Sequence, residues 1–387
     1  MRAQPQFSTD GFAVKLGLFY AAYFLFGGIQ LPFFPVWLEA KGLDPSSIGL
    51  VVAVPTLVRI FMTPIGAHLA DRYRALKAAL VISCIGGALT MSVVGLVDGS
   101  IAILVAVMVA ACFFGPTLAL TDAYAITGLR ARARAYGPVR LWGSVAFIIA
   151  NLGAGFLLGF IAADNLIWLI VAALLLAAIA AIMLVPLVPV PPVSHGPRPS
   201  IAKLWRNPAF IAIAAAASLT QGSHAAFYGF STLDWRAGGL DGTTIGALWG
   251  LGVLAEIVLF AFAGRLPTSI GPAMLLTIGA FGACLRWTAM AFDPSAGVLG
   301  ALQLLHALSF GASHLGAIAF LSRAVPQELV ATAQGTVSTI SGIVMASATG
   351  ISGLLYAASG SFAYLAMAVM SVAGFVCALT AHRVWRS

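Results

Sequence analysis

An aspartate and an arginine flank a basic turn inside an otherwise apolar stretch of the chain. Asp122 lies 8 residues before Arg130, and Arg140 lies 6 residues after Arg134. At about 1.5 Å of rise per helical residue, both side chains lie roughly 10 Å in from the same turn on two antiparallel helices. A charge inside a bilayer costs about 2.5–3.5 kcal/mol on insertion scales, so it needs a partner or a hydrated cavity. Asp122 and Arg140 are therefore either a structural ion pair or part of a transport path.

Polar side chains recur at spacings of three and four in three apolar segments, which places them on one face of each helix. These stripes are Arg140, Ser144, Phe147 and Asn151; Gln221, His224, Tyr228 and Ser231; and Gln303, His306, Phe310 and His314. An apolar helix turns such a stripe toward protein or water, so each stripe is a packing seam or a cavity wall. The histidines add side chains that titrate near neutral pH.

Acidic side chains inside predicted helices are candidates for carrying a proton. Glu256 is the only glutamate within such a segment, and a carboxyl group that faces a cavity is able to bind and release a proton. Asp122 is the second candidate. The alternative for Glu256 is a fixed salt bridge to Arg140 or Arg286. Arg59 lies 197 positions before Glu256, at the equivalent position of the first half. It either has a role in the site or makes a structural contact.

The composition indicates that lipid is the solvent of this chain. Of its 387 residues, 61% are hydrophobic and 8% are charged, whereas soluble domains carry about 25% charged residues. Twelve apolar segments are long enough to cross a bilayer as helices. They cover residues 13–37, 47–69, 77–97, 101–127, 136–162, 166–188, 208–232, 244–263, 272–292, 296–322, 333–357 and 362–383.

The basic residues predict how the chain is oriented. Of the 20 lysines and arginines, 15 fall on one side of the membrane, three lie within helices, and only Lys41 and Arg236 fall on the other side. Basic loops remain in the cytoplasm, so we expect both termini there and the chain in the cytoplasmic (inner) membrane. The net charge of +8 then reflects topology, and we expect no nucleic-acid partner.

The two halves of the sequence repeat. Residues 42–49 match residues 239–246 at an offset of 197, and residues 133–139 match residues 331–337 at an offset of 198. Repeated six-helix halves are typical of transporters, with the substrate site near mid-membrane. We divide the chain into an N-terminal six-helix bundle (1–188), a proline-rich cytoplasmic linker (189–207) and a C-terminal six-helix bundle (208–387).

Motifs for other chemistries are missing from the sequence. It contains neither the G-x-x-x-x-G-K-[ST] loop that binds nucleotide phosphates nor an H-E-x-x-H zinc helix. The four cysteines lack the spacing of metal ligands. We expect no enzyme activity, no catalytic residues, no metal and no cofactor. The driving force is then an ion gradient, for which the titratable residues favour protons.

Residues 66–77 resemble the loop between helices 2 and 3 of the major facilitator superfamily. The resemblance implies that Gly66, Asp71 and Arg72 form a gating loop on the cytoplasmic side. Tyr73 replaces the usual glycine.

The closer resemblance is to the phenylpropionate permease group, relatives of the galactoside–proton symporters. It is carried by residues 31–39, 55–59 and 136–144. It implies that Asp122 and Arg140 contact substrate, with Phe147 in the place of a sugar-stacking tryptophan. It also implies coupling roles for Glu256, Arg286 and His306. Ser309 stands where those symporters carry a titrating glutamate, which puts proton coupling in question.

We therefore predict an all-α membrane protein with twelve transmembrane helices in two pseudo-symmetric six-helix bundles around a central cavity. The predicted function is proton-coupled uptake of a small aromatic acid by a monomer. The alternatives are a proton-driven efflux antiporter and a symporter of a sugar or nucleoside. Predicted substrate contacts are Asp122, Arg140, Ser144, Phe147, Tyr20, His224 and Tyr228, and predicted coupling residues are Asp122, Glu256, Arg286, His306 and His314.

Overall fold

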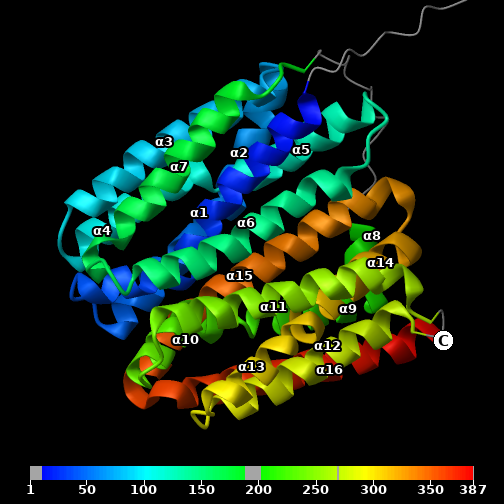
Figure 1. The fold of residues 1–387 in the computed structure, drawn as a ribbon. Helices are drawn as coiled ribbons and strands as arrows, with labels where there is room; N and C mark the ends of the chain where they lie inside the picture. Colours follow the sequence, from blue (N-terminus) through cyan, green and yellow to red (C-terminus); the bar gives the residue numbers. More distant parts are fainter. Residues whose placement is uncertain (1–10, 188–201, 268–269, 387) are drawn as a thin grey trace, which may run out of the picture.

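The computed structural model describes residues 11–187, 202–267 and 270–386, in which every regular element is a helix (Figure 1). The first half contains α1 (Phe12–Ala40), α2 (Pro45–Arg72), α3 (Leu76–Leu96), α4 (Ser100–Phe114), α5 (Thr117–Arg130), α6 (Tyr136–Leu157), η1 (Ala163–Asn165) and α7 (Leu166–Met183). The second contains α8 (Ala202–Trp205), α9 (Pro208–Gly222), α10 (Ala225–Ala237), α11 (Gly242–Phe262), η2 (Ala263–Arg265), α12 (Pro272–Met290), α13 (Ala296–Leu304), η3 (Ala307–Ala312), α14 (Ser313–Ala324), α15 (Gln327–Ser359), η4 (Gly360–Phe362) and α16 (Ala363–Arg386).

The described helices form 11 apolar spans long enough to cross a membrane. The last span, Glu328–Val384, has 57 residues and contains both α15 and α16. At about 1.5 Å per residue it is far longer than a bilayer is thick, so it crosses twice. The predicted all-α membrane fold with twelve crossings is confirmed.

The two halves meet mainly along two helix pairs, α2 with α15 and α6 with α11, and α1 also packs against α10 (Figure 1). The start of α1 and the end of α16 lie at one end of the bundle, together with the 131–135 turn, and we call this end the terminal face. The 41–44 and 238–241 turns lie at the opposite face. The predicted domain boundaries stay a prediction, because most of the 189–207 linker lies outside the described residues.

The turns at the opposite face explain the sequence repeat. Gly42 and Gly239 adopt φ of 79° and 87°, and in both turns the following leucine N–H bonds back to a carbonyl five residues earlier. This closes the preceding helix with a Schellman motif, for which glycine has the lowest cost. Asp44 and Asp241 then cap the next helix through backbone N–H groups.

The cap at Asp44 also fixes its charge state. The hydroxyl of Ser47 donates to the carboxylate at 2.6 Å, and the backbone N–H groups of Ser46 and Ser47 add two longer bonds. These donors hold the pKa of the Asp44 carboxyl below its usual value. The cap therefore remains ionised at neutral pH.

The predicted gating residues Gly66, Asp71 and Arg72 lie in the last two turns of α2, and the turn that follows lies at the terminal face. Arg74 has a φ of 51° and ends the helix in another Schellman motif, with Ala75 N–H bonding the Ala70 carbonyl. A left-handed non-glycine residue costs about 1–2 kcal/mol. Tyr73, which replaces the usual glycine, has a φ of −92°, so the backbone requires no glycine there.

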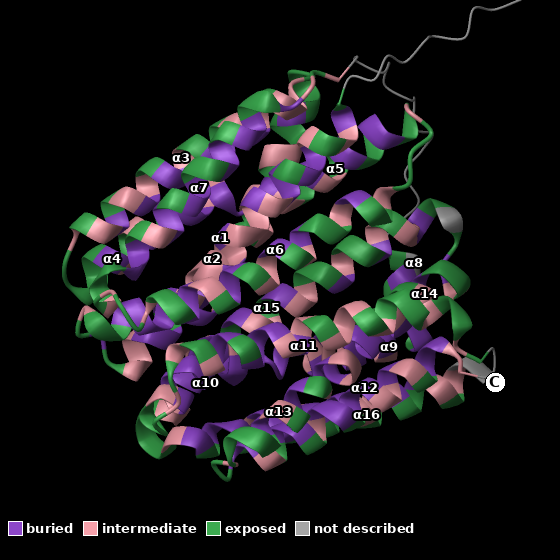
Figure 2. Ribbon diagram, viewed as in Figure 1, coloured by how far each residue is buried: buried purple, intermediate pink, exposed green. Residues whose placement is uncertain are grey.

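Exposed residues recur along the outer helices (Figure 2), and many of them are large apolar side chains, as expected for surfaces that face lipid. On α2 the exposed side chains Leu57, Phe61, Ile65 and Leu69 recur every four residues. Arg59 is two residues from Leu57 and from Phe61, which places it about 200° around the helix from both. Arg59 therefore points away from lipid.

Glycines close the opposite face where the halves meet. A Cβ built on Gly242 of α11 would lie 2.3 Å from the carbonyl oxygen of Gly155 on α6. A Cβ on Gly246 would lie 2.2 Å from the Asn151 carbonyl oxygen. The α2–α15 pair is equally close, with a Cβ on Gly49 placed 2.7 Å from Cα of Gly353. Any side chain at these positions would force the halves apart.

We predict that Gly242→Ala shifts the protein toward a state that is open at the opposite face. The added methyl group overlaps backbone atoms, and overpacking of this kind costs about 1–3 kcal/mol, a shift of roughly fivefold or more. The measurement is electron–electron double resonance between spin labels at Asp164→Cys and Ser295→Cys, with the four native cysteines replaced.

The matched control is Gly153→Ala, since a Cβ at Gly153 on α6 meets nothing within 4 Å. The control should keep the short label separation of the parent protein. A Gly242→Ala distance distribution identical to that of the control would contradict the closing role of the glycine contacts.

Candidate functional site

A cavity of about 880 Å³ lies between the two halves. Its walls come from α1 and α6 on one side and from α10, α11, α12 and the α13–α14 segment on the other. The lining includes Tyr136 and Pro138 in the first turn of α6, and Phe260 and Ala261 in the last turn of α11. These turns lie at the terminal face, so the cavity extends toward that face while glycine contacts close the other.

The structure brings most of the predicted site residues together. The cavity is lined by Arg140, Ser144, Phe147, Tyr228, Glu256, Arg286, His306 and His314. Outside the lining are Asp122, Tyr20 and His224, together with the predicted gating residues Gly66, Asp71 and Arg72. The predicted set therefore divides into residues that line the cavity, side chains behind them and a separate group at the end of α2.

Arg286 on α12 is completely buried beside the cavity. Its Nη2 donates to Oε1 of Gln303 at 2.5 Å, and its Nη1 donates to Nδ1 of His306 at 3.0 Å. Its guanidinium also stacks on Phe227 at 4.4 Å from the ring centroid. Among the residues that the structure describes, no carboxylate lies within 4.0 Å of this cation. A buried positive charge is therefore held by neutral partners only.

The bond from Arg286 sets the tautomer of His306. A guanidinium has donors and no acceptor, so Nδ1 of His306 must offer a lone pair. In the neutral ring the proton then sits on Nε2, which faces Oε2 of Glu256 at 3.7 Å. His306 thus links the buried cation to the acid on the cavity wall.

His224 lies between α9 and α10, behind the wall. Its Nδ1 is 3.1 Å and 3.2 Å from the carbonyl oxygens of Thr220 and Gln221, so Nδ1 carries the proton. Its Nε2 accepts from the hydroxyl of Ser309 at 3.2 Å. Ser309 in turn accepts from Arg286 at 3.4 Å. Both ring nitrogens of His224 therefore form hydrogen bonds within the protein.

Asp122 and Arg140 do not form an ion pair. Oδ1 of Asp122 accepts from the hydroxyls of Tyr20 at 2.6 Å and Tyr136 at 2.8 Å. The Arg140 guanidinium lies over the ring of Phe24, 4.0 Å from its centroid. The two tyrosine hydroxyls satisfy the Asp122 carboxylate, so the Arg140 guanidinium remains available to a ligand in the cavity.

The polar stripe on α6 has two roles in the structure. Arg140, Ser144 and Phe147 line the cavity, whereas Asn151 is fully buried in the seam against α11. The side-chain nitrogen and oxygen of Asn151 find no hydrogen-bond partner among the described residues. The stripe is a cavity wall for most of its length and a packing seam at its end.

Three of the membrane crossings are interrupted beside the site. The fourth breaks at Gly115 and Pro116 between α4 and α5, and the seventh breaks at Ser223 and His224. The tenth contains the π-helical turn η3, which follows His306. π-Helical turns occur often at functional sites, and here the turn lies between the two histidines of one stripe.

Gln303, Phe227 and Trp249 line the cavity although none is among the predicted site residues. Gln303 lies on the predicted polar stripe of the tenth crossing, which the structure shows to be a cavity wall. Phe227 and Trp249 gave no signal, because aromatic side chains fill membrane helices in any case. In the described ranges, no three His, Cys, Asp or Glu side chains are grouped so that they could hold a metal ion.

Comparisons with known proteins show the family to which the chain is similar. A family model described as "MFS_1 like family" matches residues 13–366. The chain is 31% identical over 363 residues to a probable 3-phenylpropionic acid transporter of Escherichia coli, covering 92% of this chain and 94% of the relative. It is 26% identical to a maltose permease of Geobacillus stearothermophilus, covering 84% and 82%.

Solved structures share the fold at low sequence identity. The crystal structure of the nucleoside transporter NupG superposes with a TM-score of 0.78 at 18% identity, covering 97% of this chain and 99% of that one. A bacterial homologue of the lysosomal transporter Spinster, in an inward-facing and unoccupied conformation, gives 0.75 at 14% identity, covering 99% and 98%.

We predict that Gln303→Leu lowers the apparent midpoint of thermal unfolding in detergent. The substitution removes the 2.5 Å bond to Arg286, and a hydrogen bond to a charged group contributes about 1.5–3 kcal/mol. The matched control is Ser313→Ala, because the buried hydroxyl of Ser313 has no partner among the described residues. Equal midpoints for the two variants would show that Gln303 does not stabilise the buried cation.

Proposed function

The chain belongs to the MFS_1-like family of the major facilitator superfamily, and from that premise we propose that it takes up a small aryl carboxylic acid together with protons. It is a multi-pass membrane protein and a secondary transporter. The finer statements below concern the substrate, the orientation and the coupling ion.

Two cations that line the cavity carry the substrate proposal. Arg140 lies on α6 and Arg286 on α12, on opposite sides of the cavity, and among the described residues neither has a carboxylate within 4.0 Å. Phe147, Tyr228 and Trp249 supply aromatic surface around the same cavity. Guanidinium groups bind carboxylates through paired hydrogen bonds. The E. coli relative, named a probable 3-phenylpropionic acid transporter, points to the same substrate class.

We propose that the terminal face is cytoplasmic, in agreement with the lysine and arginine distribution. The cavity then extends toward the cytoplasm while the glycine contacts close the outer side. The chain would act as a monomer in the inner membrane, because each monomer contains both halves of its cavity.

Glu256 is the proton carrier in this proposal, and no further cofactor takes part. It lines the cavity and lies 3.7 Å from Nε2 of His306. Asp122 is less suited to the role, because two tyrosine hydroxyls hold it behind the wall. Coupling does not require an acid in the place of Ser309, since Glu256 on α11 lines the cavity.

We predict that purified protein in liposomes accumulates labelled 3-phenylpropionate when the interior is made alkaline. Maltose and uridine, which represent the sugar and nucleoside alternatives, should not accumulate. Scintillation counting of the filtered liposomes measures uptake. Uptake of a sugar or nucleoside without the acid, or extrusion of the acid against an inward proton gradient, would overturn the proposal.

We predict that Glu256→Gln abolishes uphill uptake but retains exchange of internal for external 3-phenylpropionate. The amide cannot release a proton, yet the cavity and its arginines remain. Gradient-driven uptake and equilibrium exchange are measured on the same liposomes. The matched control is Glu328→Gln, at the exposed start of α15, which should keep both activities. Retained uphill uptake in Glu256→Gln would remove Glu256 from the coupling step.

A further inference from the structure

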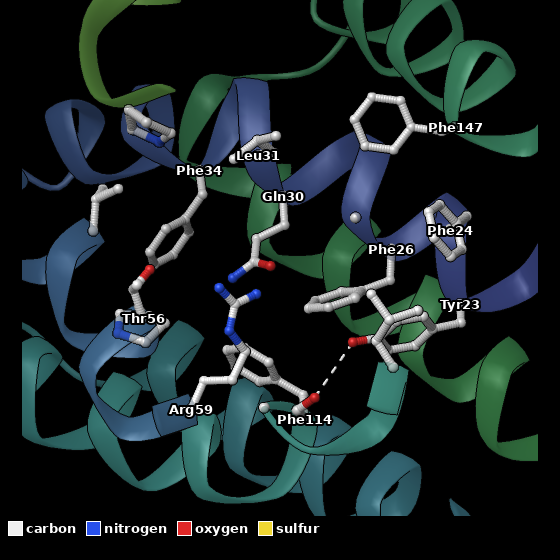
Figure 3. A pocket seen from close by; sticks show the side chains of 16 residues that line it. Tyr23, Phe24, Phe26, Gln30, Leu31, Phe34, Thr56, Arg59, Phe114 and Phe147 are labelled. Atoms are coloured by element: carbon white, nitrogen blue, oxygen red, sulfur yellow. Dashed lines mark hydrogen bonds between the residues drawn. The ribbon is translucent and has the colours of Figure 1, made fainter. Parts of the chain in front are cut away.

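A second cavity, of about 350 Å³, lies within the first half (Figure 3). We call it the side chamber. It is formed by α1, α2, the α4–α5 break and α6, and it shares Phe24, Leu31 and Phe147 with the central cavity. The two spaces therefore adjoin one another across these three side chains.

The side chamber is aromatic, with one cation. The rings of Tyr23, Phe24, Phe26, Phe34, Phe114 and Phe147 line it. In Figure 3 the Arg59 guanidinium and the Gln30 carboxamide point toward one another in the space among these rings. Tyr23 is turned away from the cation, since its hydroxyl donates to the Phe114 carbonyl at 3.3 Å. This combination of surfaces fits a ligand with one ring and one negative group.

Arg59 has no acid to neutralise it. Among the described residues no carboxylate lies within 4.0 Å of its guanidinium. The stripe of exposed apolar side chains on α2 lies on the other side of the helix, and Arg59, which is exposed, lines the side chamber. Arginine inside a membrane span usually marks a substrate or ion path when it faces a cavity. The neighbouring amide of Gln30 adds two N–H donors for a carboxylate.

The repeat places the side chamber opposite a matching part of the central cavity. Six residues of the side chamber have a counterpart 197 positions later that lines the central cavity. The pairs are Gln30 and Phe227, Leu31 and Tyr228, Val52 and Trp249, Pro55 and Gly252, Thr56 and Val253, and Arg59 and Glu256. The two halves thus present corresponding pockets at equal depth, one with a cation where the other has an acid.

We propose that the side chamber is a second binding site for the aryl carboxylate, with the carboxylate on Arg59 and Gln30 and the ring among Phe26, Phe34 and Phe114. The site is separate from the Arg140 wall of the central cavity. Acid and cation then occupy equivalent positions in the two halves, so an anion in the side chamber and a proton on Glu256 bind to different halves. This inference rests on the substrate class proposed above.

The test uses the full chain in lipid nanodiscs and the photoreactive probe 3-(4-azidophenyl)propionate, with labelled residues identified by mass spectrometry. Two groups of labels are expected in the parent protein, one on α1 and α4 around Phe34 and Phe114 and one on α6 and α11. Excess 3-phenylpropionate should remove both groups. Arg59→Gln should reduce the first group at least about tenfold, because a charged hydrogen bond is lost, and leave the second unchanged.

The retained second group shows that the Arg59→Gln variant is folded. Arg130→Gln, at the exposed end of α5, is the matched control and should keep both groups. If central labels appear without side-chamber labels, or if side-chamber labelling survives Arg59→Gln or is lost in Arg130→Gln, the inference is overturned while the proposed function stands. Absence of any label that 3-phenylpropionate removes would overturn the proposed function itself.

Discussion

The structure depends on keeping guanidinium groups out of lipid. Arg286 has no exposed surface, and its partners Gln303, His306 and Ser309 all come from the α13–η3 segment. That segment approaches α12 closely because Gly279 has no side chain; a Cβ there would lie 2.0 Å from Oγ of Ser313. Small residues allow membrane helices to meet at such distances. The buried cation thereby determines the path of the tenth crossing and the shape of the cavity wall.

A shared backbone with different side chains gives the two halves different chemistry. The turns at Gly42 and Gly239 have the same hydrogen-bond pattern, and so have the caps that follow them. At equivalent depth, however, α2 carries Arg59 and α11 carries Glu256. A repeated backbone does not require a repeated function. Turns and glycine contacts determine the backbone, whereas a few inward side chains determine the chemistry.

Local patterns predicted the helices well and the contacts poorly. The apolar segments and capping residues gave the crossings, because membrane length and turn chemistry are local constraints. The depth of Asp122 was predicted, yet its tyrosine partners come from α1 and the start of α6, which only tertiary packing brings together. The interruption at Gly115 and Pro116 had a sequence signal. The π-helical turn and the break at His224 had none, since no proline marks them.

The turns at the opposite face have a mechanical consequence. Each is tied by a left-handed glycine, a back-bonded leucine and a capping aspartate, so the end of α1 is fixed to the start of α2, and the end of α10 to the start of α11. A turn fixed in this way passes a rotation of one helix on to the next and acts as a lever. The compliance of the molecule must then reside in the interrupted crossings, α4–α5, α9–α10 and α13–α14. Tilting of the levers would therefore be absorbed next to the bound ligand, where it changes the contacts that hold it.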